Sequence, residues 1–169
     1  APAGTYNVVV AADADNSIAP IDVDLTLEAT SSYTVIAVGS LIDNSLAPIL
    51  TDDDRRNIAT AALVEVIHGS YQVAGQIPVD VYLTTDGVIA NASPAISDLS
   101  YQETTGQLGL TPGDYWITVT AAGDKSTVAF DTGGPLALDA GVNYTVIARD
   151  PSIQEGAGSP LINVTLLTD

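Results

Sequence analysis

An internal repeat with only one complete copy constrains this chain more than any other feature. Residues 33–37, Tyr-Thr-Val-Ile-Ala, recur without change as residues 144–148. Flanking stretches recur in the same order, aligning 3–10 with 112–119, 25–29 with 136–140, and 50–52 with 167–169. The repeat unit is therefore roughly 110 residues long. Strands resembling 63–68 and 79–83 have no counterpart in the first copy, which contains only the second half of a unit.

Period-two alternation predicts β-strands rather than helices. Residues 21–27, Ile-Asp-Val-Asp-Leu-Thr-Leu, place four apolar side chains on one face of a strand and three polar ones on the other. Only residues 52–62 show mild helical character. Similar alternating segments, separated by turns rich in Gly, Pro, Asn and Asp, are 6–10, 33–38, 63–68, 79–83, 115–119, 127–130, 144–148 and 162–167. We predict an all-β fold, an antiparallel β-sandwich of Ig-like, Greek-key type.

The repeat also sets the expected domains: a half β-unit at 1–54, a linker at 55–61 and a complete β-sandwich unit at 62–169. The half unit supplies about half of a two-layer core, and an uncovered face with open edges favours aggregation. Three arrangements can cover it. The missing half was removed or lies outside this sequence, the complete unit covers the face, or a neighbouring molecule supplies strands by donation or swapping.

Composition excludes several classes of function. The chain has 4 Lys and Arg against 21 Asp and Glu, a formal net charge of −17, which opposes binding to nucleic acid or an anionic membrane. It lacks cysteine, and therefore disulfides, thiolate catalysis and Cys-based metal sites. No apolar run is long enough to insert into a membrane. Abundant Thr, Ser, Asn, Gly and Ala favour an extracellular or cell-surface protein whose signal peptide has been removed. The acidic groups suit either hydration in high salt or neutralisation by divalent cations.

One pair of motifs resembles a known family. Residues 64–70, Val-Glu-Val-Ile-His-Gly-Ser, precede residues 77–83, Ile-Pro-Val-Asp-Val-Tyr-Leu. Together they resemble the start of the secreted all-β family called domain of unknown function 4397, and residues 110–115 and 138–148 resemble its later strands. The resemblance covers 60–169 as a full copy and 1–54 as a half copy. Gly69 replaces the usual Ala, and the loop at 71–76 lacks the usual Pro-Asp-Ala-Pro. Since the family has no assigned activity, the resemblance implies a fold and an extracellular location.

The only histidine, His68, has Glu65 and Ser70 close in sequence, which permits a hydrolytic site to be considered. Alternation places Glu65 and His68 on opposite faces of a strand, and no Gly-x-Ser-x-Gly motif is present. We expect His68 to bond to backbone or pack beside a tyrosine, and we expect no enzyme activity.

Three further sets of residues are candidate binding positions. Asp13, Asp15 and Ser17 offer oxygen ligands for calcium, although a plain hairpin turn explains them as well and the spacing is not that of an EF-hand. Asn91, Asn143 and Asn163 begin glycosylation sequons. Trp116 could present a platform for carbohydrate, or could belong to the core.

The last candidate site is a subunit interface. Arg55 and Arg56 are half of all cationic side chains and would attract acidic loops of another molecule, unless they belong to a solvated linker. Tyr6, Val8 and Val10 would form the apolar face that strands of a neighbour complete. We therefore predict a non-catalytic structural subunit of an extracellular filament or surface assembly, a homopolymer formed by strand complementation. The alternative is a cell-surface adhesion or carbohydrate-binding module, in which Trp116 or the loop at 84–86 is exposed.

Overall fold

The computed structural model describes residues 2–11, 13, 18–40, 45–53, 56–71, 77–151 and 162–168, which form strands β1 to β13 and no helix. The all-β prediction is confirmed. Residue contacts divide the chain into unit 1, Ala1–Arg55, and unit 2, Arg56–Asp169. The described part of the chain contains no helix long and apolar enough to cross a bilayer.

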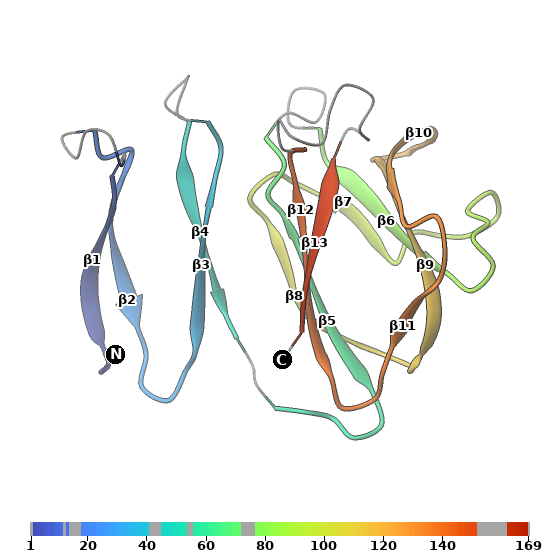
Figure 1. The fold of residues 1–169 in the computed structure, drawn as a ribbon, viewed down its shortest axis with the longest axis horizontal. Helices are drawn as coiled ribbons and strands as arrows, with labels where there is room; N and C mark the ends of the chain where they lie inside the picture. Colours follow the sequence, from blue (N-terminus) through green and yellow to red (C-terminus); the bar gives the residue numbers. More distant parts are fainter. Residues whose placement is uncertain are drawn as a thin grey trace. The chain divides into compact units, whose positions relative to one another are not determined.

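Unit 1 consists of two antiparallel hairpins (Figure 1). Strand β1 (Gly4–Val10) pairs with β2 (Ile21–Leu27), and β3 (Tyr33–Val38) pairs with β4 (Ala47–Asp52). The alternation gives the first hairpin an apolar face, on which Val8 lies opposite Val23. On its other face the Asn7 side-chain amide donates to the carboxylates of Asp22, at 2.8 Å, and Asp24, at 3.1 Å.

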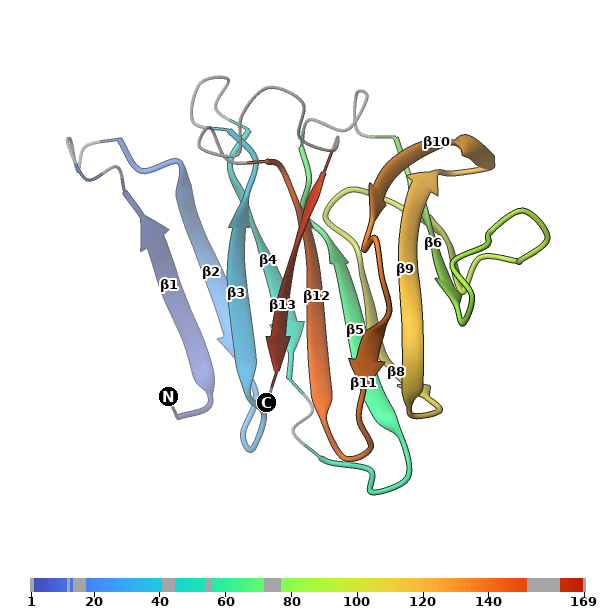
Figure 2. The same ribbon diagram turned by 45° about the vertical axis from the view of Figure 1, so that its right-hand side comes forward.

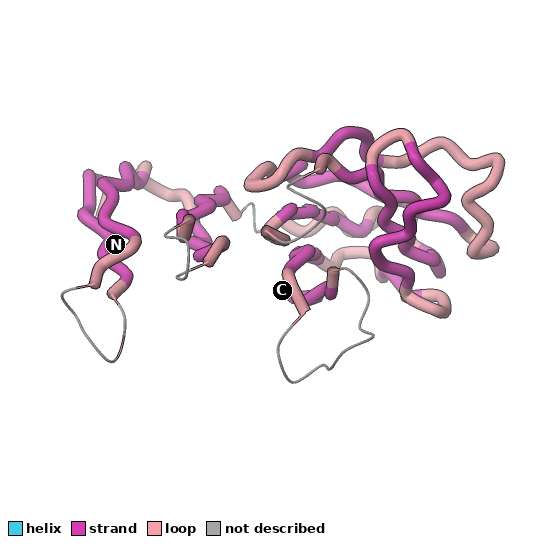
Figure 3. Tube along the Cα trace, turned by 90° about the horizontal axis from the view of Figure 1, so that it is seen from above, coloured by secondary structure: helices cyan, strands magenta, loops and turns pink. Residues whose placement is uncertain are grey.

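Unit 2 contains two sheets, visible as separate layers in Figures 2 and 3. The five-stranded sheet has the order β10-β9-β6-β7, with β11 also paired to β9, and the four-stranded sheet has the order β13-β12-β5-β8. The strand bounds are β5 Ala62–His68, β6 Val79–Thr84, β7 Ile96–Leu99, β8 Thr104–Leu110, β9 Gly113–Ala121, β10 Asp124–Asp131, β11 Leu136–Leu138, β12 Asn143–Arg149 and β13 Asn163–Thr168.

The two sheets of unit 2 enclose one hydrophobic core. Its central members are valines from both sheets, each at most 7% exposed: Val64, Val66, Val81, Val119 and Val146. Burial of apolar surface stabilises such a core by about 25 cal/mol per Å². These valines lie at alternate positions of their strands, so the period-two pattern that predicted the strands also fills the core, although β5 is buried on both of its faces.

One detail of the predicted fold is wrong. Strand β12 pairs with β5 in parallel, so the sheets are not wholly antiparallel. The alternation of side chains does not encode strand direction, which the path of the chain between the two strands decides. The stretch 52–62, where the sequence has mild helical character, forms no helix in its described residues, which end β4, form turns and begin β5.

Candidate functional site

The first hairpin of unit 1 is paired like strands β9 and β11 of unit 2. Gly4 lies opposite Leu27 and Tyr6 opposite Leu25; in unit 2 Gly113 lies opposite Leu138 and Tyr115 opposite Leu136. The two tyrosines make the same hydrogen bond. The Tyr6 hydroxyl donates to the Pro2 carbonyl at 2.7 Å, and the Tyr115 hydroxyl donates to the Thr111 carbonyl at 2.8 Å. The sequence repeat is therefore also a structural repeat in these strands.

The second hairpin corresponds in the same way to β12 and β13. The Glu28 amide donates to the Tyr33 hydroxyl at 2.9 Å, and the Asp139 amide donates to the Tyr144 hydroxyl at 2.9 Å. The register corrects the sequence alignment of the last strand. Since Val35 lies opposite Leu50 and Val146 lies opposite Leu166, Leu50 corresponds to Leu166, one residue before the position that the sequence alignment gave.

The two units differ in what lies beside these strands. In unit 2, β9 pairs with β6 on its second edge and β12 pairs with β5. In the described part of unit 1, β1 pairs only with β2 and β3 only with β4. Because β7 contacts β8 at one side of unit 2, β6 and β5 lie on the same side of β9 and β12. The edges of β1 and β3 equivalent to these are unpaired among the described residues of unit 1. We call them the open side.

Side chains near the open side are exposed where their counterparts in unit 2 are buried. Val35 is 43% exposed and its counterpart Val146 is 5% exposed. Val10 is 36% exposed and its counterpart Val119 is 4% exposed. Unit 1 therefore has apolar inner faces like those of a two-sheet core, without the neighbouring strands that would complete the burial.

The strands at the open side also lack the usual protection of an exposed sheet edge. Natural edge strands are commonly protected by charged side chains or proline. Strand β1, Gly-Thr-Tyr-Asn-Val-Val-Val, and strand β3, Tyr-Thr-Val-Ile-Ala-Val, contain neither. The outer strands of the hairpins do contain them: Asp22 and Asp24 in β2, and Pro48 and Asp52 in β4. The open side is therefore suited to pairing with another strand.

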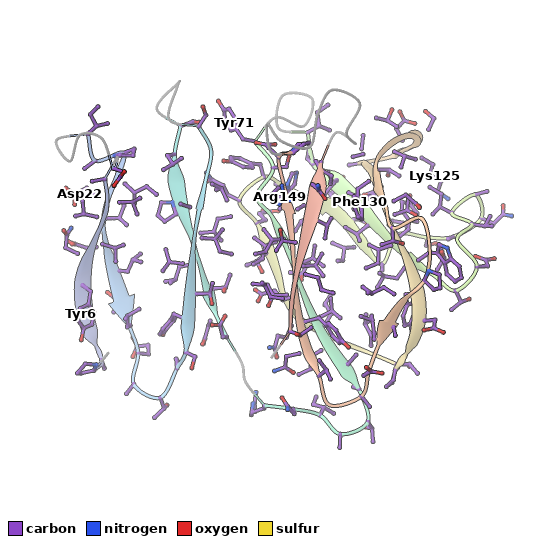
Figure 4. The ribbon with its side chains drawn as sticks, in the orientation of Figure 1. Tyr6, Asp22, Tyr71, Lys125, Phe130 and Arg149 are labelled. Carbon is purple, nitrogen blue, oxygen red and sulfur yellow. The ribbon has the colours of Figure 1, made fainter. Side chains whose placement is uncertain are left out.

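The predicted interface residues fall partly on this surface. Tyr6, Val8 and Val10 share the apolar face of β1, with Tyr6 and Val8 half-buried (Figure 4 labels Tyr6). Arg56 is exposed at the start of unit 2, and Arg55 lies outside the described residues. Sequence reasoning missed the β3 edge around Val35, although the identical pentapeptide, matched to a core strand of the complete unit, was an available signal.

His68 lies at the end of β5, is fully buried and helps to line an apolar cavity of about 20 Å³ between the sheets of unit 2. Its ring packs edge-on against Tyr101, with ring centroids 6.1 Å apart. Burial lowers the pKa of His68, and the backbone of Ile77 and the carboxylate of Asp150 oppose that shift. Removal from water disfavours the charged imidazolium, which is why burial lowers the pKa.

The residues considered for hydrolysis are not assembled into a catalytic site. The Ser70 hydroxyl donates to the Asp150 carboxylate at 2.6 Å, and the Thr104 hydroxyl donates to the Glu65 carboxylate. His68 lines the inner cavity of unit 2, on the strand face opposite Glu65. In a Ser–His pair the serine hydroxyl donates to the imidazole, whereas the Ser70 hydroxyl donates to Asp150.

The predicted carbohydrate platform is partly covered. Trp116 is half-buried on β9, and the loop after β6 packs against its indole ring. Gly87, at φ +75°, lies so close that a Cβ there would be 3.0 Å from Trp116 Cδ1. Lys125, labelled in Figure 4, anchors this loop because its Nζ donates to the carbonyls of Ala90 and Ala92 at 3.0 and 2.7 Å.

The other predicted positions are dispersed over the molecule. Asp13 is exposed in a turn, whereas Asp15 and Ser17 lie outside the described residues, so the calcium site stays a prediction. The described residues contain no cluster of three or more His, Asp or Glu that could hold a metal. Among the sequon residues, Asn91 is exposed in a loop, and Asn143 and Asn163 are half-buried at the starts of β12 and β13.

The chain is thus an all-β protein with one closed two-sheet unit and one unit of two hairpins with an open side. The family described as Domain of unknown function (DUF4397) matches residues 1–82, which contain β1 to β5 and most of β6. A search of curated proteins found no significant match. Among solved structures, the C-terminal domain of AlgF from P. aeruginosa is similar at 16% identity and a TM-score of 0.41, over 65% of this chain and 99% of that chain. A likeness at that score carries no argument about function.

Proposed function

We propose that this protein is a non-catalytic structural subunit of an extracellular filament or surface assembly, joined by strand complementation between subunits. In this proposal residues 1–54 are the second half of a repeat whose complete form is an Ig-like, Greek-key β-sandwich. The observation that carries the proposal is the open side of unit 1, with two uncharged strand edges beside exposed apolar side chains such as Val35.

Strand addition suits such a surface because it supplies both hydrogen-bond partners for the strand edges and cover for the exposed apolar side chains. An added strand pairs with the free backbone groups of the edge, and its alternate side chains fill the pockets between the layers. Unit 2 supplies an internal template, since β6 and β5 do this for β9 and β12. Since the sequence contains no cysteine, disulfides take no part in this strand addition.

The test is a charge placed on the outward face of the β1 edge. Val9 is 52% exposed and lies opposite Asp22, so Val9→Lys adds a favourable pair within the hairpin and leaves it folded. Val128→Lys, at a 46% exposed valine of β10 in unit 2, is the matched control with the same change in charge.

We expect the wild type and Val128→Lys to form assemblies in light scattering and negative-stain images, and Val9→Lys to form markedly fewer. Lysine on an exposed edge opposes strand addition because its charge would have to be desolvated in the new sheet. A wild-type protein that stays monomeric at every concentration tested, up to the millimolar range, would contradict the proposed function.

A further inference from the structure

We propose that the open side of unit 1 is closed by unit 1 of a second copy across a two-fold axis. Strand β1 would pair with β1 of the partner, and β3 with β3 of the partner. This inference rests on the strand complementation in the proposed function and specifies the partner. Because an isologous interface closes on itself, the pairing makes a dimer the building block, and growth into a larger assembly uses a second contact elsewhere on the molecule. It predicts two continuous sheets, in the orders β2-β1-β1-β2 and β4-β3-β3-β4, which enclose a single core.

The number of donor strands favours this partner over strand exchange. The strands that complete β9 and β12 are β6 and β5, and unit 2 of each chain already uses its own pair. If a neighbour donated β5 and β6 to unit 1, its own β9 and β12 would lose their partners. Strand exchange therefore leaves unpaired strand edges on another molecule. Two copies of unit 1 each have unpaired edges at β1 and β3, so their association pairs the edges of both copies.

The direction of the strands is compatible with a two-fold axis. The template pair, β9 with β6, is antiparallel, and an axis perpendicular to the sheet makes β1 and its symmetry mate antiparallel. The same axis makes the β3 pair antiparallel, whereas β12 and β5 are parallel. Antiparallel pairing is slightly the more stable of the two per residue, so this departure from the template carries no penalty.

The apolar face of β1 restricts the register to a few choices. Tyr6, Val8 and Val10 must meet inward-facing residues of the partner strand, because a shift by one residue would turn them to solvent. In each allowed register an outward-facing residue of β1, namely Thr5, Asn7 or Val9, lies opposite one of the same three on the partner. These three positions therefore report the register.

The charge distribution permits the β1–β1 and β3–β3 pairings in a protein of net charge −17. An isologous interface brings identical residues together, so a charged strand at the axis would meet its own charge. Strands β1 and β3 carry none. The nearest carboxylates, Asp22 and Asp24, are one strand further out and accept hydrogen bonds from Asn7. Across the interface the two β2 strands are three strand spacings apart, roughly 14 Å, which exceeds the Debye length of about 8–10 Å, so these charges are largely screened.

The experiment is cysteine cross-linking in the full chain, which has no cysteine of its own. Thr5→Cys, Asn7→Cys and Val9→Cys are oxidised singly and in mixed pairs, because opposite residues of an antiparallel pair are about 4.5–5.5 Å apart at Cα, within disulfide range. Thr26→Cys, on the outer strand β2 directly opposite Thr5, is the matched control. We expect at least one β1 variant or mixture to become a covalent dimer, no such dimer from Thr26→Cys, and a native mass that is a multiple of twice 17.3 kDa.

The outcomes separate this inference from the proposed function. Assemblies without a β1–β1 cross-link in any single or mixed sample would overturn the two-fold pairing and leave strand complementation by another segment standing. Cross-linking of Thr26→Cys as efficiently as the β1 variants would also overturn it, since it would indicate random collision. A protein that is monomeric throughout would overturn both proposals.

Discussion

Truncation of two corresponding valines measures how open unit 1 is. Val35 and Val146 occupy the same place in the identical pentapeptide, but Val35 is 43% exposed and Val146 is 5% exposed. Val→Ala removes carbon equivalent to two methylenes, about 1.6 kcal/mol at 0.8 kcal/mol each when fully buried. The cavity left in a closed core raises the cost of Val146→Ala to roughly 2–3 kcal/mol.

For Val35→Ala the expected cost in the dilute, unassembled protein is smaller. Only about three fifths of the side chain is removed from water, so the transfer free energy is about 1 kcal/mol. Solvent reaches the site, so no empty cavity adds to it. If assembly closes the open side, the cost of Val35→Ala in the concentrated, assembled protein should rise towards that of Val146→Ala.

Hydrogen exchange measured by mass spectrometry suits this comparison, because it reports the opening free energy of the two segments separately in one molecule. Peptides covering 33–38 and 143–149 would be followed at low and high protein concentration. Equal costs for the two substitutions in the dilute protein would refute the reasoning, since they would mean that unit 1 is closed without a partner.

Three other perturbations have defined outcomes. Burial lowers the pKa of His68 below 6.5, so the unfolded chain binds a proton more readily than the folded one. The unfolding free energy is therefore fully retained above about pH 6.5 and falls as the pH drops below it. The fall is at most about 1.4 kcal/mol per pH unit and ends at the pKa of the folded state. Urea titrations from pH 8 to 5 should show a weaker dependence in His68→Gln, and parallel curves would contradict this. Gly87→Ala should lower the melting temperature more than Gly123→Ala. Both glycines have φ near +75°, but an added Cβ meets another residue, Trp116, at Gly87 and nothing within 4 Å at Gly123; equal losses would show that the indole does not restrict the loop. If the turn at 13–17 binds calcium, millimolar calcium should raise the melting temperature and a chelator should reverse the rise; no change with either removes the calcium site.

Patterns within single stretches of sequence predicted where strands lie and which of their faces is apolar, provided that the alternation is regular and long enough. Strand β2 alternates strictly, so its existence and its buried face followed from the sequence. Strand β8, Thr-Thr-Gly-Gln-Leu-Gly-Leu, was missed because two glycines interrupt its alternation, and Gly106 has φ +63° beside an irregularity in the β5–β8 register. Strand β11 has three residues, too few for periodicity to be recognised.

The candidate site was predictable where the repeat could be aligned. The alternation predicts one apolar face for Tyr6, Val8 and Val10, and these residues share that face of β1. The alignment also contained the β3 edge, but finding it required knowing that β5 lies beside β12. That neighbour comes from a parallel pairing of segments far apart in the chain, and single-strand patterns do not encode it.

The parallel pairing of β5 with β12 makes the order of synthesis important. Residues 33–37 leave the ribosome before β5 does, and the identical residues 144–148 leave long after it. A nascent β5 therefore meets a sequence-identical decoy before its true neighbour exists, and distant β pairings are in any case slow to form. Because residues 33–37 and 144–148 are identical, other residues must determine that β5 pairs with β12 and not with β3. The nearest differences are Asn143 and Arg149 in β12, which stand where Ser32 precedes β3 and Val38 ends it.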